Sequence, residues 1–102
     1  MKFAKVVGTV VSTQKDENAE GWKMMIVQPL GLDFKPRGDS MVATDAVGAG
    51  EGELVLLTSG SSARQTKVTK NRPCDLVIVA IVDIVEKEGE VIFKKFETKG
   101  FD

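Results

Sequence analysis

The stretch Val6-Val7-Gly8-Thr9-Val10-Val11-Ser12-Thr13, close to the start of the chain, decides the fold class. Most of its residues are β-branched, and such side chains fit a pleated strand better than a helix. Gly8 interrupts the run, and a glycine inside a strand indicates a bend or a close approach of another backbone. The stretch therefore predicts a bent strand of the kind that turns a corner in a small barrel.

Five further segments carry a strand signal and are separated by glycine, proline and charged residues. We expect these strands over residues 22–30, 41–44, 53–58, 76–85 and 90–96. Glu86-Lys87-Glu88-Gly89 predicts a hairpin turn, and Pro73-Cys74-Asp75 could open one helical turn because proline suits the first helical position. The predicted fold is all-β: a small five-stranded OB-like β-barrel with a short helical turn and a C-terminal β-hairpin.

The segment Leu76 to Val85 is apolar on both alternating faces, apart from Ala80 and Asp83. A strand that is covered on both sides has this pattern. The second cover could be a helix, another sheet or another subunit.

Length and composition limit the classes of protein that this chain can belong to. A chain of 102 residues, of which 42% are hydrophobic, suits one globular domain over 1–102. Lysine and arginine number 14 against 15 acidic residues, so the basic excess that drives phosphate binding is missing. The only aromatic residues are five phenylalanines and Trp22, too few for a platform on which bases stack.

The expected location is the cytoplasm. The single cysteine, Cys74, has no internal partner for a disulfide, which fits a reducing compartment. The longest uninterrupted apolar run, Leu76 to Val82, is too short to span a bilayer. We therefore expect no membrane partner.

The sequence offers little for catalysis, so we expect no enzyme, no cofactor and no metal site. There is no histidine, which removes the commonest general base and metal ligand. Gly48-Ala49-Gly50 departs from a dinucleotide-binding fingerprint, because Glu53 stands where the third glycine belongs and a strand follows. A glycine-rich bend is the simpler interpretation.

Two motifs in sequence order resemble the EutN/CcmL family of microcompartment vertex proteins. They are Asp45-Ala46-Val47-Gly48-Ala49-Gly50-Glu51-Gly52-Glu53 and Gly60-Ser61-Ser62-Ala63-Arg64, joined by an apolar strand. Gly21 to Leu30 is similar to another stretch of the family, with Met24 and Met25 in place of its usual leucines. The resemblance covers residues 1–85 and leaves 86–102 as a variable hairpin and tail.

The resemblance implies a structural shell protein that forms a cyclic pentamer and caps the five-fold vertices of a polyhedral shell. Its implied partners are other copies of itself and hexameric microcompartment shell proteins, with no nucleic acid. Both a carboxysome and a catabolic compartment are compatible with it. The residues that we expect at the pore or the subunit interface are Gly48, Ala49, Gly50, Gly60, Ser61, Ser62 and Arg64.

An alternative function follows from the fold class alone. OB-type barrels also serve as binding modules for single-stranded nucleic acid or oligosaccharide. The balanced charge and the scarcity of aromatic residues argue against this alternative.

Arg64 is the residue of these motifs that offers the most direct test. Its guanidinium could form a bidentate bond with a carboxylate such as Asp45 or Asp83. We expect Arg64→Ala to weaken the pentamer, measured as the concentration at which the ring dissociates. A mutant ring that survives dilution as well as the parent would contradict this role.

Overall fold

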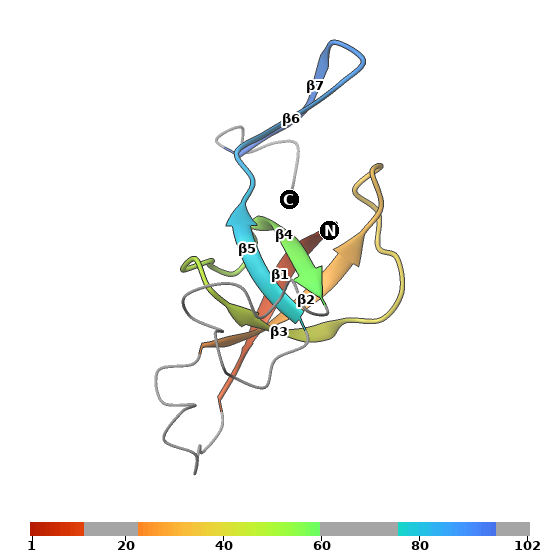
Figure 1. Cartoon of the computed structure of the whole chain (residues 1–102). Coiled ribbons are helices and arrows are strands. Elements are labelled where there is room, and N and C mark those ends of the chain that lie inside the picture. Colours follow the sequence, from red (N-terminus) through yellow and green to blue (C-terminus); the bar gives the residue numbers. More distant parts are fainter. Residues whose placement is uncertain (12–22, 60–75, 96–102) are drawn as a thin grey trace.

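The computed structural model describes residues 1–11, 23–59 and 76–95. All regular structure in these residues is β-strand (Figure 1). The strands are β1 (Lys2–Val10), β2 (Met24–Leu30), β3 (Met41–Asp45), β4 (Leu54–Ser59), β5 (Leu76–Ile81), β6 (Ile84–Lys87) and β7 (Glu90–Lys94). The helical turn expected at residues 73–75 lies outside the described residues.

Strands β1 to β5 close into a barrel in the order β1-β2-β3-β5-β4, and β4 returns to pair with β1. Four of the five neighbouring pairs are antiparallel, and β3 with β5 is parallel. The closed five-stranded barrel and the C-terminal hairpin that we predicted are both confirmed. Closure pairs every barrel strand on both sides, so the barrel exposes no open sheet edge.

The bend expected at Gly8 is a bulge in β1. Val6 lies opposite Val27 and Gly8 lies opposite Ile26, so Val7 is an extra residue in the ladder. A Cβ atom at Gly8 would lie 3.4 Å from the side chain of Ile26, which is close but ordinary contact. The bulge increases the twist of β1, which pairs with β4 through its first half and with β2 along its whole length.

The barrel interior is filled by alternate side chains from all five strands. Its fully buried members are aliphatic or methionine side chains. The largest fully buried side chains inside the barrel are Met25, Leu57, Ile78, Val6, Val27 and Val55. Leu54 and Val77 are also fully buried, but they belong to two separate clusters outside the barrel core.

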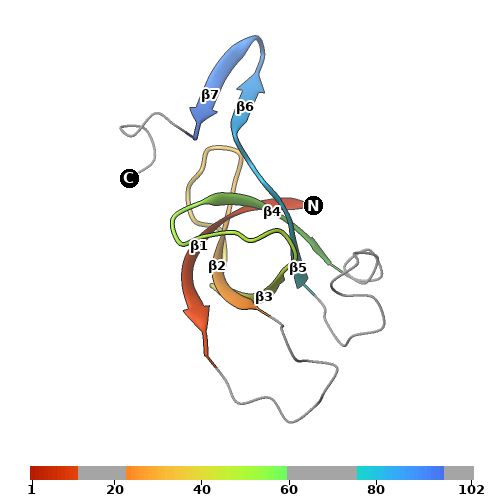
Figure 2. The same ribbon diagram turned by 90° about the vertical axis from the view of Figure 1, so that its left-hand side faces the viewer.

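The apolar segment 76–85 forms two strands, so our prediction of one continuous strand was wrong. β5 ends at Ile81, and the last bond to the barrel runs from the amide of Val82 to the carbonyl of Leu54 at 2.9 Å. β4 begins at Leu54, so the chain beyond Val82 has no barrel strand to pair with. It leaves the barrel, and β6 pairs with β7 in a separate hairpin that projects from one end (Figures 1 and 2).

Three phenylalanine rings fasten the base of the hairpin to the barrel. Phe34 lies between Phe3 of β1 and Phe93 of β7, with ring centroids 5.8 Å and 5.9 Å apart. Phe34 has a positive φ of 62°, in a turn where its amide donates to the carbonyl of Gly31 at 2.9 Å. The loop 31–38, to which the sequence assigned no role, thus supplies the ring that holds the C-terminal hairpin.

Candidate functional site

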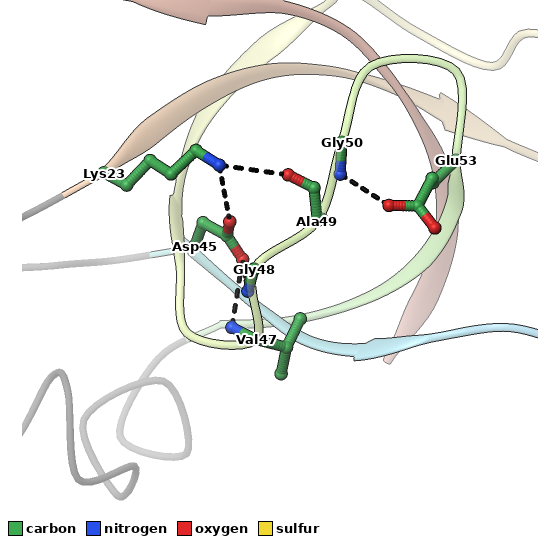
Figure 3. Close-up of polar contacts among 7 residues, drawn as sticks. All are labelled: Lys23, Asp45, Val47, Gly48, Ala49, Gly50 and Glu53. Carbon is green, nitrogen blue, oxygen red and sulfur yellow. Dashed lines mark hydrogen bonds and ion pairs between the residues drawn. The ribbon is translucent and has the colours of Figure 1, made fainter.

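The turn between β3 and β4 contains the predicted site residues Gly48, Ala49 and Gly50 (Figure 3). The other predicted site residues, Gly60, Ser61, Ser62 and Arg64, lie outside the described residues. Within the described residues, the candidate site consists of the 45–53 turn and the side chains that contact it.

Asp45 ends β3 and organises the first half of the turn. One carboxylate oxygen, Oδ1, accepts hydrogen bonds from the amides of Val47 and Gly48, each at 3.0 Å. An aspartate that caps two following amides in this way replaces the backbone partners lost where a strand ends. Asp45 is only 6% exposed, so these bonds form in a setting shielded from water.

The second carboxylate oxygen of Asp45 is buried and accepts no hydrogen bond among the described residues. The ammonium of Lys23 lies 3.8 Å from it and donates to the carbonyl of Ala49 at 3.4 Å. Lys23, which directly precedes β2, thus contacts the turn at both Asp45 and Ala49, as Figure 3 shows. The Lys23 side chain is 55% exposed, so the ion pair lies at the boundary with solvent.

The three consecutive small residues of the turn, Gly48, Ala49 and Gly50, occupy different environments. Gly48 has a positive φ of 78° and nothing within 4 Å of its Cβ position, so backbone conformation is what requires glycine there. Ala49 is fully buried in the barrel core. A Cβ atom at Gly50 would lie 3.3 Å from Oε1 of Glu53, which makes this the crowded position of the three.

Glu53 closes the second half of the turn. Its Oε1 accepts from the amide of Gly50 at 2.6 Å, and its own amide donates to the Gly50 carbonyl at 3.2 Å. The turn then joins β1, because the amide of Gly52 donates to the carbonyl of Val6 at 2.7 Å. The bulge in β1 and the glycine-rich turn are therefore one connected structure.

Glu53 also fastens the turn to the C-terminal hairpin. Its Oε2 lies 2.8 Å from the ammonium of Lys95, which is 3.9 Å from Oδ1 of Asp83. The bond from Lys95, together with that from the Gly50 amide, lowers the pKa of Glu53 below its ordinary value. The same bond to Glu53 raises the pKa of Lys95. The strand pattern did not reveal this pair, since the two residues are far apart in sequence.

The polar side chains of the turn have a structural role. The carboxylates of Asp45 and Glu53 each hold backbone amides of the turn and a neighbouring lysine. Residues 1–11, 23–59 and 76–95 contain no group of three or more histidine, cysteine or acidic side chains that could hold a metal ion. The same ranges contain no helix of the length and apolarity needed to cross a membrane.

Relatives of this chain are shell vertex proteins. It is 42% identical over 95 residues to the carboxysome shell vertex protein CcmL of Thermosynechococcus vestitus, covering 93% of this chain and 96% of that protein. It is 43% identical over 95 residues to the microcompartment shell vertex protein EutN of Escherichia coli K12, covering 93% of this chain and all of that protein.

Solved structures agree with the fold. The structure of CcmL from Nostoc sp. PCC 7120 superposes with a TM-score of 0.86 at 43% identity, covering 93% of this chain and 100% of that one. The pentameric microcompartment shell protein GrpN from Rhodospirillum rubrum superposes with a TM-score of 0.75 at 45% identity, covering 85% and 99%.

The fold, the turn and these relatives define the class: small β-barrel proteins of the microcompartment shell vertex type, which are structural proteins rather than enzymes. Within that class the chain belongs to the EutN/CcmL family. The sequence model of that family, described as ethanolamine utilisation protein EutN/carboxysome, matches residues 1–83. The resemblance found in the sequence motifs is thereby confirmed.

We predict that Asp45→Ala lowers the free energy of unfolding by about 2–3 kcal/mol, because two amides of the turn lose a charged acceptor. Asp45→Asn is the matched control. Its side-chain oxygen can accept the same two bonds, so it should lose less than half as much. Urea unfolding monitored by circular dichroism measures both values, and equal losses would contradict the capping role.

We predict that the Glu53–Lys95 pair contributes to stability at neutral pH and not in acid. The folded pKa of Glu53 lies below the ordinary value of 4.5, so the stabilisation is present above that pH and is lost as pH falls through the lowered pKa. Glu53→Gln keeps an acceptor for the Gly50 amide and removes the charge. Its unfolding midpoint should lie a few degrees below that of the parent at pH 7, and the two midpoints should converge once the pH has fallen below the lowered pKa of Glu53. A deficit that persists unchanged in acid would show that the charge is not responsible.

Proposed function

We propose that this chain is a structural shell protein of a bacterial microcompartment, which assembles as a cyclic pentamer at the five-fold vertices of the shell. The observation that carries the proposal is the similarity to the pentameric shell protein GrpN, which includes 99% of that chain. The proposal places the chain in the cytoplasm, in a shell whose facets consist of hexameric proteins.

The surface of the barrel supports assembly through side chains. A ring closes through heterologous contacts, in which one face of a subunit meets a different face of the next. The barrel has no open edge to extend, so such contacts need exposed apolar side chains. Val7, Val42 and Val47 are 41%, 52% and 40% exposed, and the side chains of Leu76 and Val79 to Ile81 in β5 are only half-buried. The interpretation of 76–85 as a segment covered by another subunit is consistent with this surface.

Within this ring we assign the 48–50 turn and residues 60–64 to the pore or the subunit interface. The buried second oxygen of Asp45, which accepts no hydrogen bond among the described residues, supports this assignment. An arginine such as Arg64, from the same chain or from a neighbour, is a donor of suitable chemistry for it.

We treat 1–102 as a single domain with residues 1–85 as the family core. The family match over 1–83 supports that boundary.

The alternative of a nucleic-acid or oligosaccharide module gains no support from the aromatic residues that the structure describes. Phe3, Phe34 and Phe93 pack on one another at the base of the hairpin, so their rings are used within the chain. They are therefore not splayed on a sheet surface where bases could stack.

The native mass over a dilution series tests the proposed function. We expect a species of about 55 kDa, five copies of an 11.0 kDa chain, by native mass spectrometry and by sedimentation. It should persist to micromolar concentration. A monomer or dimer at every concentration would refute the ring, and oligonucleotide binding at low salt would then revive the alternative.

A further inference from the structure

The β6–β7 hairpin stands apart from the rest of the fold. Its two strands pair only with each other, and both views show it projecting from one end of the barrel (Figures 1 and 2). A two-stranded hairpin is at best marginally stable in water, so one that projects is expected to pack against another surface. The family model ends at residue 83, one residue before β6, whereas the match to CcmL and EutN covers 93% of this chain and therefore extends into the hairpin.

At the base of the hairpin, one face packs against the barrel and the opposite face is exposed. Phe93 is 8% exposed and packs against Leu30 and Leu54 of the barrel. The register places Val85 opposite Phe93 and Ile84 opposite Lys94, so Ile84 lies on the other face.

A bulge adds to the exposed face. The ladder continues with Glu86 opposite Val91, which puts Val91 on the same face as Ile84 and leaves Ile92 as the extra residue. Ile84, Val91 and Ile92 are 57%, 47% and 38% exposed. The tip beyond them is acidic, with Glu86, Glu88 and Glu90 against Lys87.

The barrel carries a surface of matching character near the N-terminus, where β4 ends. A pocket of about 300 Å³ is lined mainly by apolar side chains, among them Met1, Met41, Leu57 and Leu76, with the exposed cation Lys2 beside them. An apolar lining with a neighbouring positive charge complements an apolar hairpin face with an acidic tip.

A hairpin cannot occupy the pocket of its own chain. The pocket lies where β4 ends, at Thr58 and Ser59, whereas the hairpin leaves the barrel beside Leu54, where β4 begins. These ends are about 17 Å apart along the strand. Phe34, Phe93 and the Glu53–Lys95 pair fix the base of the hairpin so that it points away from the barrel. Two different surfaces of one chain that match each other, and that the chain cannot bring together itself, are the arrangement that a heterologous contact needs.

We propose that the β6–β7 hairpin is an arm that docks on a second copy of this chain. Ile84, Val91 and Ile92 of the arm cover the pocket formed by Met1, Met41, Leu57 and Leu76 of the neighbour, and the acidic tip lies next to the neighbour's Lys2. The inference rests on the proposed ring. Because the barrel surface also exposes apolar side chains, the arm strengthens contacts that the barrels already make.

The first test compares two substitutions of exposed apolar residues. Ile92→Glu should raise the concentration at which the pentamer half-dissociates by about tenfold or more, because it puts a charge into an apolar contact. Leu32→Glu is the matched control, on an exposed residue of the 31–38 loop, and should change that concentration less than about twofold. Circular dichroism of both variants checks that the barrel is folded.

The second test locates the docking site by cross-linking. In a Cys74→Ser background, chains carrying Glu88→Cys are mixed with chains carrying Lys2→Cys, reassembled and oxidised. We expect a disulfide-linked dimer on a non-reducing gel. Chains with Glu51→Cys, on the exposed glycine-rich turn, replace the Lys2→Cys chains as the control and should give much less of it.

The outcomes separate the arm from the ring. A parent that forms no pentamer refutes the proposed function itself. If the parent forms a pentamer and Ile92→Glu leaves that pentamer equally stable, the arm is refuted and the ring is not. The same conclusion holds if the Ile92→Glu pentamer is stable but does not assemble into complete shells. A weakened ring in which Glu88→Cys links to Glu51→Cys rather than to Lys2→Cys refutes the pocket as the docking site.

Discussion

Closure of the five-stranded barrel is the constraint on which the other features depend, and closure depends on β1. This strand pairs with β4 through Lys2 to Lys5 and with β2 as far as Val10. A straight strand does not follow both neighbours around a barrel of five strands, and the extra residue at Val7 supplies the local twist. The glycine-rich turn is bonded to the same place, since Val6 donates its amide to the carbonyl of Glu53 and accepts from the amide of Gly52.

The turn is the junction between the barrel and the C-terminal hairpin. Asp45 caps the first half of the turn. One carboxylate oxygen of Glu53 accepts a hydrogen bond from the amide of Gly50 within the turn, and the other pairs with Lys95, which directly follows β7. The hairpin has a second attachment through Phe34, which comes from a separate loop and carries a strained backbone to place its ring. Two independent attachments give the hairpin a defined direction, which a contact surface outside the barrel requires.

A closed barrel also determines how such a chain can assemble. With its strands paired on both sides, the barrel has no edge on which a neighbour can extend the sheet. Contacts between copies must therefore come from side chains on the barrel surface, from loops and from the hairpin. This fits a vertex protein, because a shell needs rings of defined number, whereas an open sheet edge promotes continued addition.

Local structure and family membership both follow from the order of the residues along the chain. β-branched runs separated by glycine and charged residues predicted the strands and the bend at Gly8, because these preferences act between neighbouring residues. The two motifs at 45–53 and 60–64 identified the EutN/CcmL family, which the comparisons confirm.

The point at which the apolar segment 76–85 breaks follows from the fold and not from the residue pattern, because it depends on where β4 begins, more than twenty residues earlier in the chain. The same holds for the burial of Ala49, the role of Phe34 and the pairing of Glu53 with Lys95. Each is a contact between segments distant in the sequence, and strand pattern carries no information about which segments closure brings together.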